Sequence, residues 1–124
     1  YIDETSNQLG FHFSEGKYTP YAGDIYEKLI KKYFIPPPSM MIKRVVLEQL
    51  KGYDENLAYE DFDFWIRSSR NWNYAYQPAS LTLVRRLKGS LSSKAYSKND
   101  KQLHSTFLVC EKIKSLNKTE KEGI

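Results

Sequence analysis

The 124-residue sequence contains a single cysteine, Cys110. One cysteine can form neither an intrachain disulfide nor a cysteine-based zinc site, so the chain is compatible with a reducing, cytoplasmic compartment. Long apolar runs are also missing, since no stretch approaches the roughly 20 residues that a transmembrane helix needs. The chain opens on Tyr1 without a basic and apolar leader, and we expect a piece of a longer protein.

Hydrophobic residues make up 40% of the chain and aromatic residues 15%, which is enough for one globular domain with a buried core. Charge is distributed unevenly: residues 1–85 carry a net charge of −1 and residues 86–124 a net charge of +5, which together give the formal +4. The basic C-terminal tail predicts either peripheral contact with the inner face of an anionic membrane or simply a solvated helix face.

Helices are predicted where apolar residues recur at helical spacing. One should begin near Asp24, because Asp24 and Glu27 have the spacing of a capping box, and it should end before the prolines at 36–38. A second is predicted over 45–50, with Gly52 just beyond its end in a left-handed conformation. A third should run from Phe62 onward. A long amphipathic helix is predicted over 94–116, with its buried face listed here: Tyr96, Leu103, Phe107, Cys110 and Ile113.

Strands are predicted for four segments with alternating or continuous apolar residues, 11–13, 40–42, 73–77 and 81–85. The first of these contains His12, to which we assign a structural role. The last eight residues, 117–124, are polar and are predicted to be disordered.

The most informative stretch runs from Gly52 to Arg67 and contains five carboxylates. Phe62, Trp65 and Ile66 predict one apolar face of a helix, which leaves Glu60 and Asp61 at its entrance. Carboxylates stabilise a helix N-terminus by about 0.3–1 kcal/mol each, so capping alone is one explanation for this pair.

The complete string is more specific than the acidic pair. Gly-Tyr-Asp-Glu at 52–55, followed by Tyr-Glu-Asp-Phe-Asp-Phe-Trp-Ile-Arg at 59–67, resembles the acceptor-side signature of the inverting nucleotide-sugar glycosyltransferases of family 2. Pro-Ser-Met-Met-Ile at 38–42 and the segment from Tyr74 to Arg86 continue the resemblance in order and spacing. It therefore extends from Ile35 to about Ser93.

This resemblance implies an α/β fold. The chain would be the C-terminal portion of a GT-A type nucleotide-diphospho-sugar transferase, a mixed sheet with flanking helices, without the N-terminal nucleotide-binding half. Within it we expect an acceptor-side part over 1–93, the amphipathic helix over 94–116 and the tail over 117–124.

The resemblance also implies roles for six residues. Asp61 is the expected general base of an inverting transfer to an acceptor hydroxyl. The acceptor-binding residues are expected to be Glu60, Ser39 and Trp65, and the residues that bind the donor diphosphate are expected to be Arg85 and Arg86. Some of these residues have an alternative explanation without function. Ser39 could simply be part of a stiff proline-rich connector, and the two arginines at the end of a strand could simply be exposed surface charges.

Asp61 and Asp63 form an Asp-x-Asp pair, the pattern that binds the metal in these enzymes. Here the pair opens an amphipathic helix and Arg67 lies four residues beyond Asp63, which favours a helical ion pair over a metal site. No metal ligand is therefore predicted in this chain, and the divalent cation expected in the full-length enzyme, Mg²⁺ or Mn²⁺, would be held by the other half.

The expected partners are a nucleotide-sugar donor and a glycan or lipid-linked acceptor, and not nucleic acid. Two other interpretations stay open. The chain could be a non-catalytic module that binds glycans or nucleic acid on its aromatic side chains, or a degenerate structural partner of an active transferase.

Overall fold

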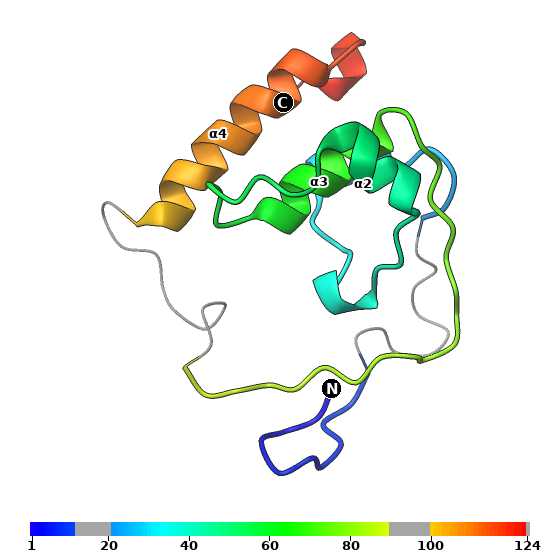
Figure 1. The fold of residues 1–124 in the computed structure, drawn as a ribbon, viewed down its shortest axis with the longest axis vertical. Helices are drawn as coiled ribbons and strands as arrows, with labels where there is room; N and C mark the ends of the chain where they lie inside the picture. The colour runs from blue at the N-terminus through cyan, green and yellow to red at the C-terminus, as the bar shows by residue number, and fades with distance from the viewer. Residues whose placement is uncertain (12–20, 90–99, 124) are drawn as a thin grey trace. The chain divides into compact units, whose positions relative to one another are not determined.

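The computed structural model describes residues 1–11, 21–89 and 100–123. The chain divides into two compact units, one made of Tyr1–Pro20 with Gln77–Ala95 and the other of Tyr21–Tyr76 with Tyr96–Ile124. Every helix in the described part of the chain belongs to the second unit (Figure 1).

The helices follow one another in the order α1 (Tyr26–Lys31), η1 (Pro37–Ser39), α2 (Arg44–Leu50), α3 (Glu60–Ser69), α4 (Lys101–Leu116) and η3 (Glu120–Glu122). The elements η1 and η3 are single 3₁₀ turns. The helices predicted near Asp24, over 45–50 and from Phe62 onward are thus confirmed.

The ends of α1 and α2 match their sequence signals in most respects. At the start of α1, a carboxylate oxygen of Asp24 accepts a hydrogen bond from the Tyr26 N–H at 3.1 Å. Glu27 does not close the predicted capping box and instead pairs with Lys31 at 2.6 Å. At the end of α2, Gly52 has the predicted left-handed backbone, with a φ of 71°.

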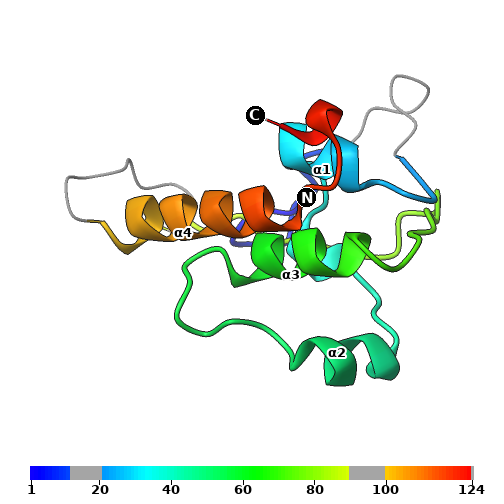
Figure 2. The same cartoon turned by 90° about the horizontal axis from the view of Figure 1, so that it is seen from above.

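The helix α3 is the centre of the second unit, because α1, α2 and α4 all contact it (Figure 2). Its predicted apolar face is confirmed, since Trp65 and Ile66 are buried and Phe62 is half-buried. The core around α3 consists of Ile25, Tyr26, Leu29, Phe34, Val46, Leu57, Phe64, Trp65, Ile66, Val109 and Ile113. Burial of each large apolar side chain contributes about 1.5–3 kcal/mol, so this cluster holds the helices together.

The predicted α/β fold with a mixed sheet is wrong for the described part of the chain. Residues 1–11, 21–89 and 100–123 contain no strand, only three isolated bridges: Ile2 with Gln8, Ile2 with Arg85, and Gly23 with Tyr74. The segment 81–85 does not form a strand because its apolar side chains are not packed against the rest of the chain: Leu81 and Leu83 are each 77% exposed. Of the predicted strand 11–13, residues 12 and 13 lie outside the described residues.

The predicted buried strand over 40–42 is also wrong. This segment is irregular, and the Met41 side chain is 98% exposed. An extended strand buries alternate side chains only where another strand or helix covers that face. Here η1 turns the chain immediately before Met40, whose N–H donates to Pro37 O at 3.3 Å, and the segment leads directly into α2.

The helix predicted over 94–116 is described from Lys101 to Leu116, and residues 94–99 lie outside the described residues. Its predicted buried face is confirmed at Ile113 and wrong at Leu103, Phe107 and Cys110, all three of which are exposed. Leu103 and Phe107 are 56% and 62% exposed, and the residues that α4 buries are Ser105, Val109 and Ile113. Polar contacts select this face: the Ala58 N–H donates to Ser105 Oγ at 2.8 Å, an interaction that apolar periodicity cannot register.

The C-terminal residues 117–123, within the segment predicted to be disordered, contact the helices of the second unit. Asn117 accepts a hydrogen bond from the Tyr26 hydroxyl at 2.8 Å. The Glu122 carboxylate pairs with Arg70 at 2.9 Å, and the Arg70 guanidinium lies 3.7 Å from the centre of the Tyr26 ring. These contacts attach η3 to α1 and to the end of α3.

Candidate active site

Asp61 occupies the first turn of α3, as the sequence predicts, and its carboxylate is half-buried. One oxygen accepts a hydrogen bond from the Phe62 N–H at 2.6 Å, and the other accepts one from the Tyr33 hydroxyl at 3.2 Å. Burial raises the pKa of Asp61 above its ordinary value, because it disfavours the charged form more than these two hydrogen bonds favour it. The carboxylate of Glu60 raises the pKa further.

Aromatic side chains surround this carboxylate. The centre of the Tyr33 ring lies 5.7 Å from that of Phe62 and 5.2 Å from that of Trp65. Tyr53, in the segment between α2 and α3, lies close to the same two carboxylates. Burial and then the charges of Asp61 and Glu60 raise the pKa of its hydroxyl. Tyr33 and Tyr53 remain 49% and 41% exposed, so a ligand can reach the space next to Asp61.

The other predicted acceptor residues are placed differently from one another. Glu60 is the exposed first residue of α3 and adjoins Asp61. Trp65 is completely buried, and its indole N–H has no hydrogen-bond partner among the described residues. Ser39 is exposed in η1, where its hydroxyl donates to Pro36 O at 2.7 Å and closes the turn after the prolines.

Arg85 and Arg86 belong to the first unit. The Arg85 guanidinium donates to the carbonyl oxygens of Asp3 and Glu4 at 2.8 and 3.0 Å, and to the Ser6 hydroxyl at 3.0 Å. The Arg86 guanidinium lies 4.0 Å from the centre of the Tyr1 ring. Both side chains therefore hold the N-terminal turn, while their exposure leaves them accessible to an anion.

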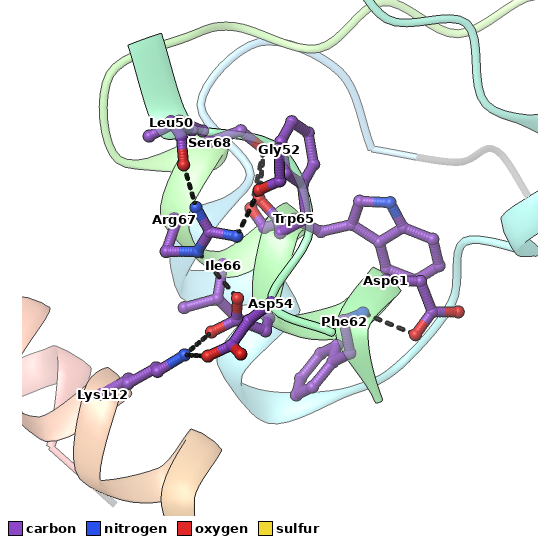
Figure 3. Close-up of polar contacts among 12 residues, drawn as sticks. Leu50, Gly52, Asp54, Asp61, Phe62, Trp65, Ile66, Arg67, Ser68 and Lys112 are labelled. Atoms are coloured by element: carbon purple, nitrogen blue, oxygen red, sulfur yellow. Dashed lines mark hydrogen bonds and ion pairs between the residues drawn. The ribbon is translucent and has the colours of Figure 1, made fainter. Parts of the chain in front are cut away.

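The sequence predicts only the Asp63–Arg67 pair of an ion-pair network that lies on the side of α3 opposite Asp61 (Figure 3). Asp63 pairs with Arg67 at 2.7 Å, as predicted, but its side chain is almost completely buried and also pairs with Lys112 of α4 at 2.9 Å. Lys112 reaches Asp54 as well, at 2.7 Å. The hydrogen bond from Lys112 is the main cause that lowers the pKa of the Asp54 carboxyl. The network borders a depression of about 290 Å³ that Tyr53 also lines.

Residues 1–11, 21–89 and 100–123 contain neither a metal-binding cluster nor a membrane-spanning helix. No three histidine, cysteine or carboxylate side chains come together there in the way that a metal site needs. No helix in this part of the chain has the length and apolar character that crossing a bilayer takes.

Comparison with known proteins gives one informative relative. The chain is 43% identical over 77 residues to the uncharacterized glycosyltransferase MJ1057 of Methanocaldococcus jannaschii, a match that covers 57% of this chain and 23% of the relative. No family model matches the chain, and no solved structure does. The match supports the general prediction that the chain is related to glycosyltransferases.

Proposed function

We propose that this chain is the acceptor-side part of an inverting, family 2 glycosyltransferase in which Asp61 is the general base. Two observations support the proposal. The first is the 43% sequence identity, over 77 residues, to a protein named as a glycosyltransferase. The chain spans about a quarter of that protein. The second, which carries the assignment of the base, is the half-buried Asp61 carboxylate with a raised pKa between two exposed tyrosines.

Sugar transfer needs a base because the acceptor hydroxyl is a poor nucleophile until its proton leaves. In the proposed step the acceptor oxygen forms a bond to the anomeric carbon, the bond from that carbon to the nucleoside diphosphate breaks, and Asp61 takes the hydroxyl proton. A carboxylate whose pKa is raised by burial accepts a proton more readily than one in water. The Tyr33 hydroxyl, 3.2 Å from Asp61, holds the carboxylate in place for this transfer.

The remaining roles follow the same scheme. Glu60 and Ser39 bind acceptor hydroxyls, and Arg85 or Arg86 neutralises charge on the departing diphosphate. Trp65 is buried, so its part is to support the wall behind Asp61 and not to touch the acceptor. No ligand set for Mg²⁺ or Mn²⁺ lies among residues 1–11, 21–89 and 100–123, and the proposal places this cation outside the chain.

The test is Asp61→Asn in the full-length protein, with transfer from nucleotide sugars followed by release of nucleoside diphosphate. Asparagine keeps an oxygen that can accept the Phe62 N–H, and loss of one negative charge from the first turn of α3 costs at most about 1 kcal/mol, so stability changes little. It cannot accept the proton, so turnover should fall by about 10²–10⁴-fold while donor affinity stays the same.

Asp100→Asn is the matched control, because Asp100 caps α4 by accepting a hydrogen bond from the Gln102 N–H at 3.0 Å. It makes the same substitution at a helix N-terminus that has no part in the proposed site. Near-normal turnover in Asp61→Asn, or an equal loss in Asp100→Asn, would show that Asp61 is not the base.

A further inference from the structure

The loop that delivers Asp61 to its place consists of residues 53–59, called here the Asp61 loop. It leaves the end of α2, carries Tyr53 at its first position and enters α3 immediately before Glu60 and Asp61. In the sequence this loop connects α2 to α3. Its polar contacts, however, reach a helix more than forty residues further along the chain.

Near its start, the Asp61 loop is held by charge. The Lys112 ammonium group donates to Asp54 at 2.7 Å and to the buried Asp63 at 2.9 Å, so one cation from α4 joins the loop to α3. Arg67, the other partner of Asp63, donates to the carbonyl oxygens of Leu50 and Gly52 at 2.8 and 2.9 Å, where the chain leaves α2 (Figure 3).

Near its end, the Asp61 loop is held by a neutral hydrogen bond. Ala58, three residues before Asp61, donates its N–H to the hydroxyl of Ser105, a side chain of α4 that is 1% exposed. Leu57 next to it is buried in the core at 4% exposure. Ser105 and Lys112 lie two turns apart on one face of α4, because seven residues complete almost two turns of an α-helix.

We propose that Lys112 and Ser105 of α4 are positioning residues that fix both ends of the Asp61 loop and thereby set the place of the base and of Tyr53. This inference rests on the proposed function. Neither residue touches the Asp61 carboxylate, whose neighbours are Glu60 on α3, Tyr33 beyond α1 and Tyr53 in the loop. They act by holding the loop against α3 and α4, which fixes where Tyr53 and the start of α3 lie.

The role of Lys112 is tested by the full-length Lys112→Met variant, with Lys112→Arg as the conservative replacement. Its kcat should fall by about 10²-fold with the donor KM unchanged, because displacement of a catalytic group by about 1 Å costs that much. Lys112→Arg, which can pair with both carboxylates, should restore most of the loss. The loosened loop admits water to Asp61, so the acid limb of the kcat/KM profile should move to lower pH, since burial is what raises that pKa.

Two further variants separate positioning from general stability. Ser105→Ala removes one hydrogen bond at the other end of the loop, and it should change the acid limb in the same direction while the chain stays folded. Glu122→Gln breaks the ion pair with Arg70 at the far side of the same unit, so it should lower the melting temperature and leave both kcat and the acid limb unchanged.

A loss of kcat in Glu122→Gln equal to that in Lys112→Met, at matched stability, would overturn the inference. So would a normal acid limb in both α4 variants. Amide hydrogen exchange of residues 53–59 is measured in the same proteins and should be faster in Lys112→Met and Ser105→Ala alone. Because this readout needs no turnover, unchanged exchange refutes the role of α4 itself, whereas full activity of Asp61→Asn refutes only the proposed base.

Discussion

Asp63→Asn is the perturbation whose cost can be worked out most directly from the structure. The Asp63 carboxylate is 1% exposed, and each of its oxygens accepts from a cation: Arg67 Nε at 2.7 Å and Lys112 Nζ at 2.9 Å. Asparagine keeps the shape but offers one oxygen. One of the two cations would then face an amide N–H, with both donors pointing at each other.

Loss of one member of a buried ion pair costs about 3–5 kcal/mol. The Lys112 side chain is 35% exposed and the Arg67 side chain 20%, so water reaches both cations and the lower end of that range applies. We therefore expect Asp63→Asn to reduce the free energy of unfolding by about 3 kcal/mol, a large part of the stability of a small domain. Urea titration followed by circular dichroism measures it.

Glu27→Gln is the matched control. Glu27 and Lys31 form an ion pair with the same four-residue spacing and a 2.6 Å distance, but their side chains are 45% and 54% exposed. An exposed pair of this kind contributes little to stability, so the urea midpoint should hardly move. If Asp63→Asn cost no more than Glu27→Gln, burial would not be what makes the Asp63 network important.

Two further predictions concern the N-terminal turn and the basic tail. The Asn7 side chain and backbone hold the pKa of Asp3 at about 2, so its contribution to stability should be present above about pH 4 and disappear as the pH falls toward 2. Carboxyl NMR titration should show this value, with a return toward 3.8 in Asn7→Ala; an unchanged titration in that variant would contradict the assignment. If the tail binds anionic lipid, the full-length protein should bind anionic vesicles at low salt, more weakly in 150 mM salt and in a Lys114→Glu, Lys118→Glu double variant, by about 1 kcal/mol per lysine removed from the surface. Equal binding of the double variant would exclude the tail.

The sequence predicted the helices of the second unit because their signals are local. The entrance of α3 could be recognised from Glu60 and Asp61, and the end of α2 from Gly52, since acids in a first turn and a left-handed glycine depend only on neighbouring residues. The strands were predicted wrongly because pairing depends on distant chain. Tyr74 meets Gly23 in a single bridge, and no described segment continues the ladder on either side.

The candidate site shows the same division. Asp61 could be identified at the entrance of α3, but its hydrogen-bond partner Tyr33 lies 28 residues away and carries no motif. Arg67 was predicted as the partner of Asp63 from its spacing. The second partner, Lys112, lies 49 residues further along and is one of many lysines in a basic segment. The spacing therefore predicted one of the two ion pairs of Asp63 and neither the second pair nor its burial.

The roles of Asp61, Glu60, Ser39, Arg85 and Arg86 stay predictions, as do the boundaries at 93 and 116 and the divalent cation. The residue roles depend on how this chain meets a substrate. The Asp61→Asn, Lys112→Met and Ser105→Ala variants address the first of these directly.

The separation of Asp61 and Asp63 along α3 also fixes what changes in length this region can accept. Two residues apart on a helix means about 200° apart around its axis, so one carboxylate faces the tyrosines while the other faces α4. With Asp63 held by Arg67 and Lys112, α3 cannot rotate about its axis, and the direction of Asp61 is set with it. An insertion of one residue between them would turn Asp61 by about 100° around the helix axis, away from its place beside Tyr33. Insertions and deletions that keep the site intact must therefore fall outside α3.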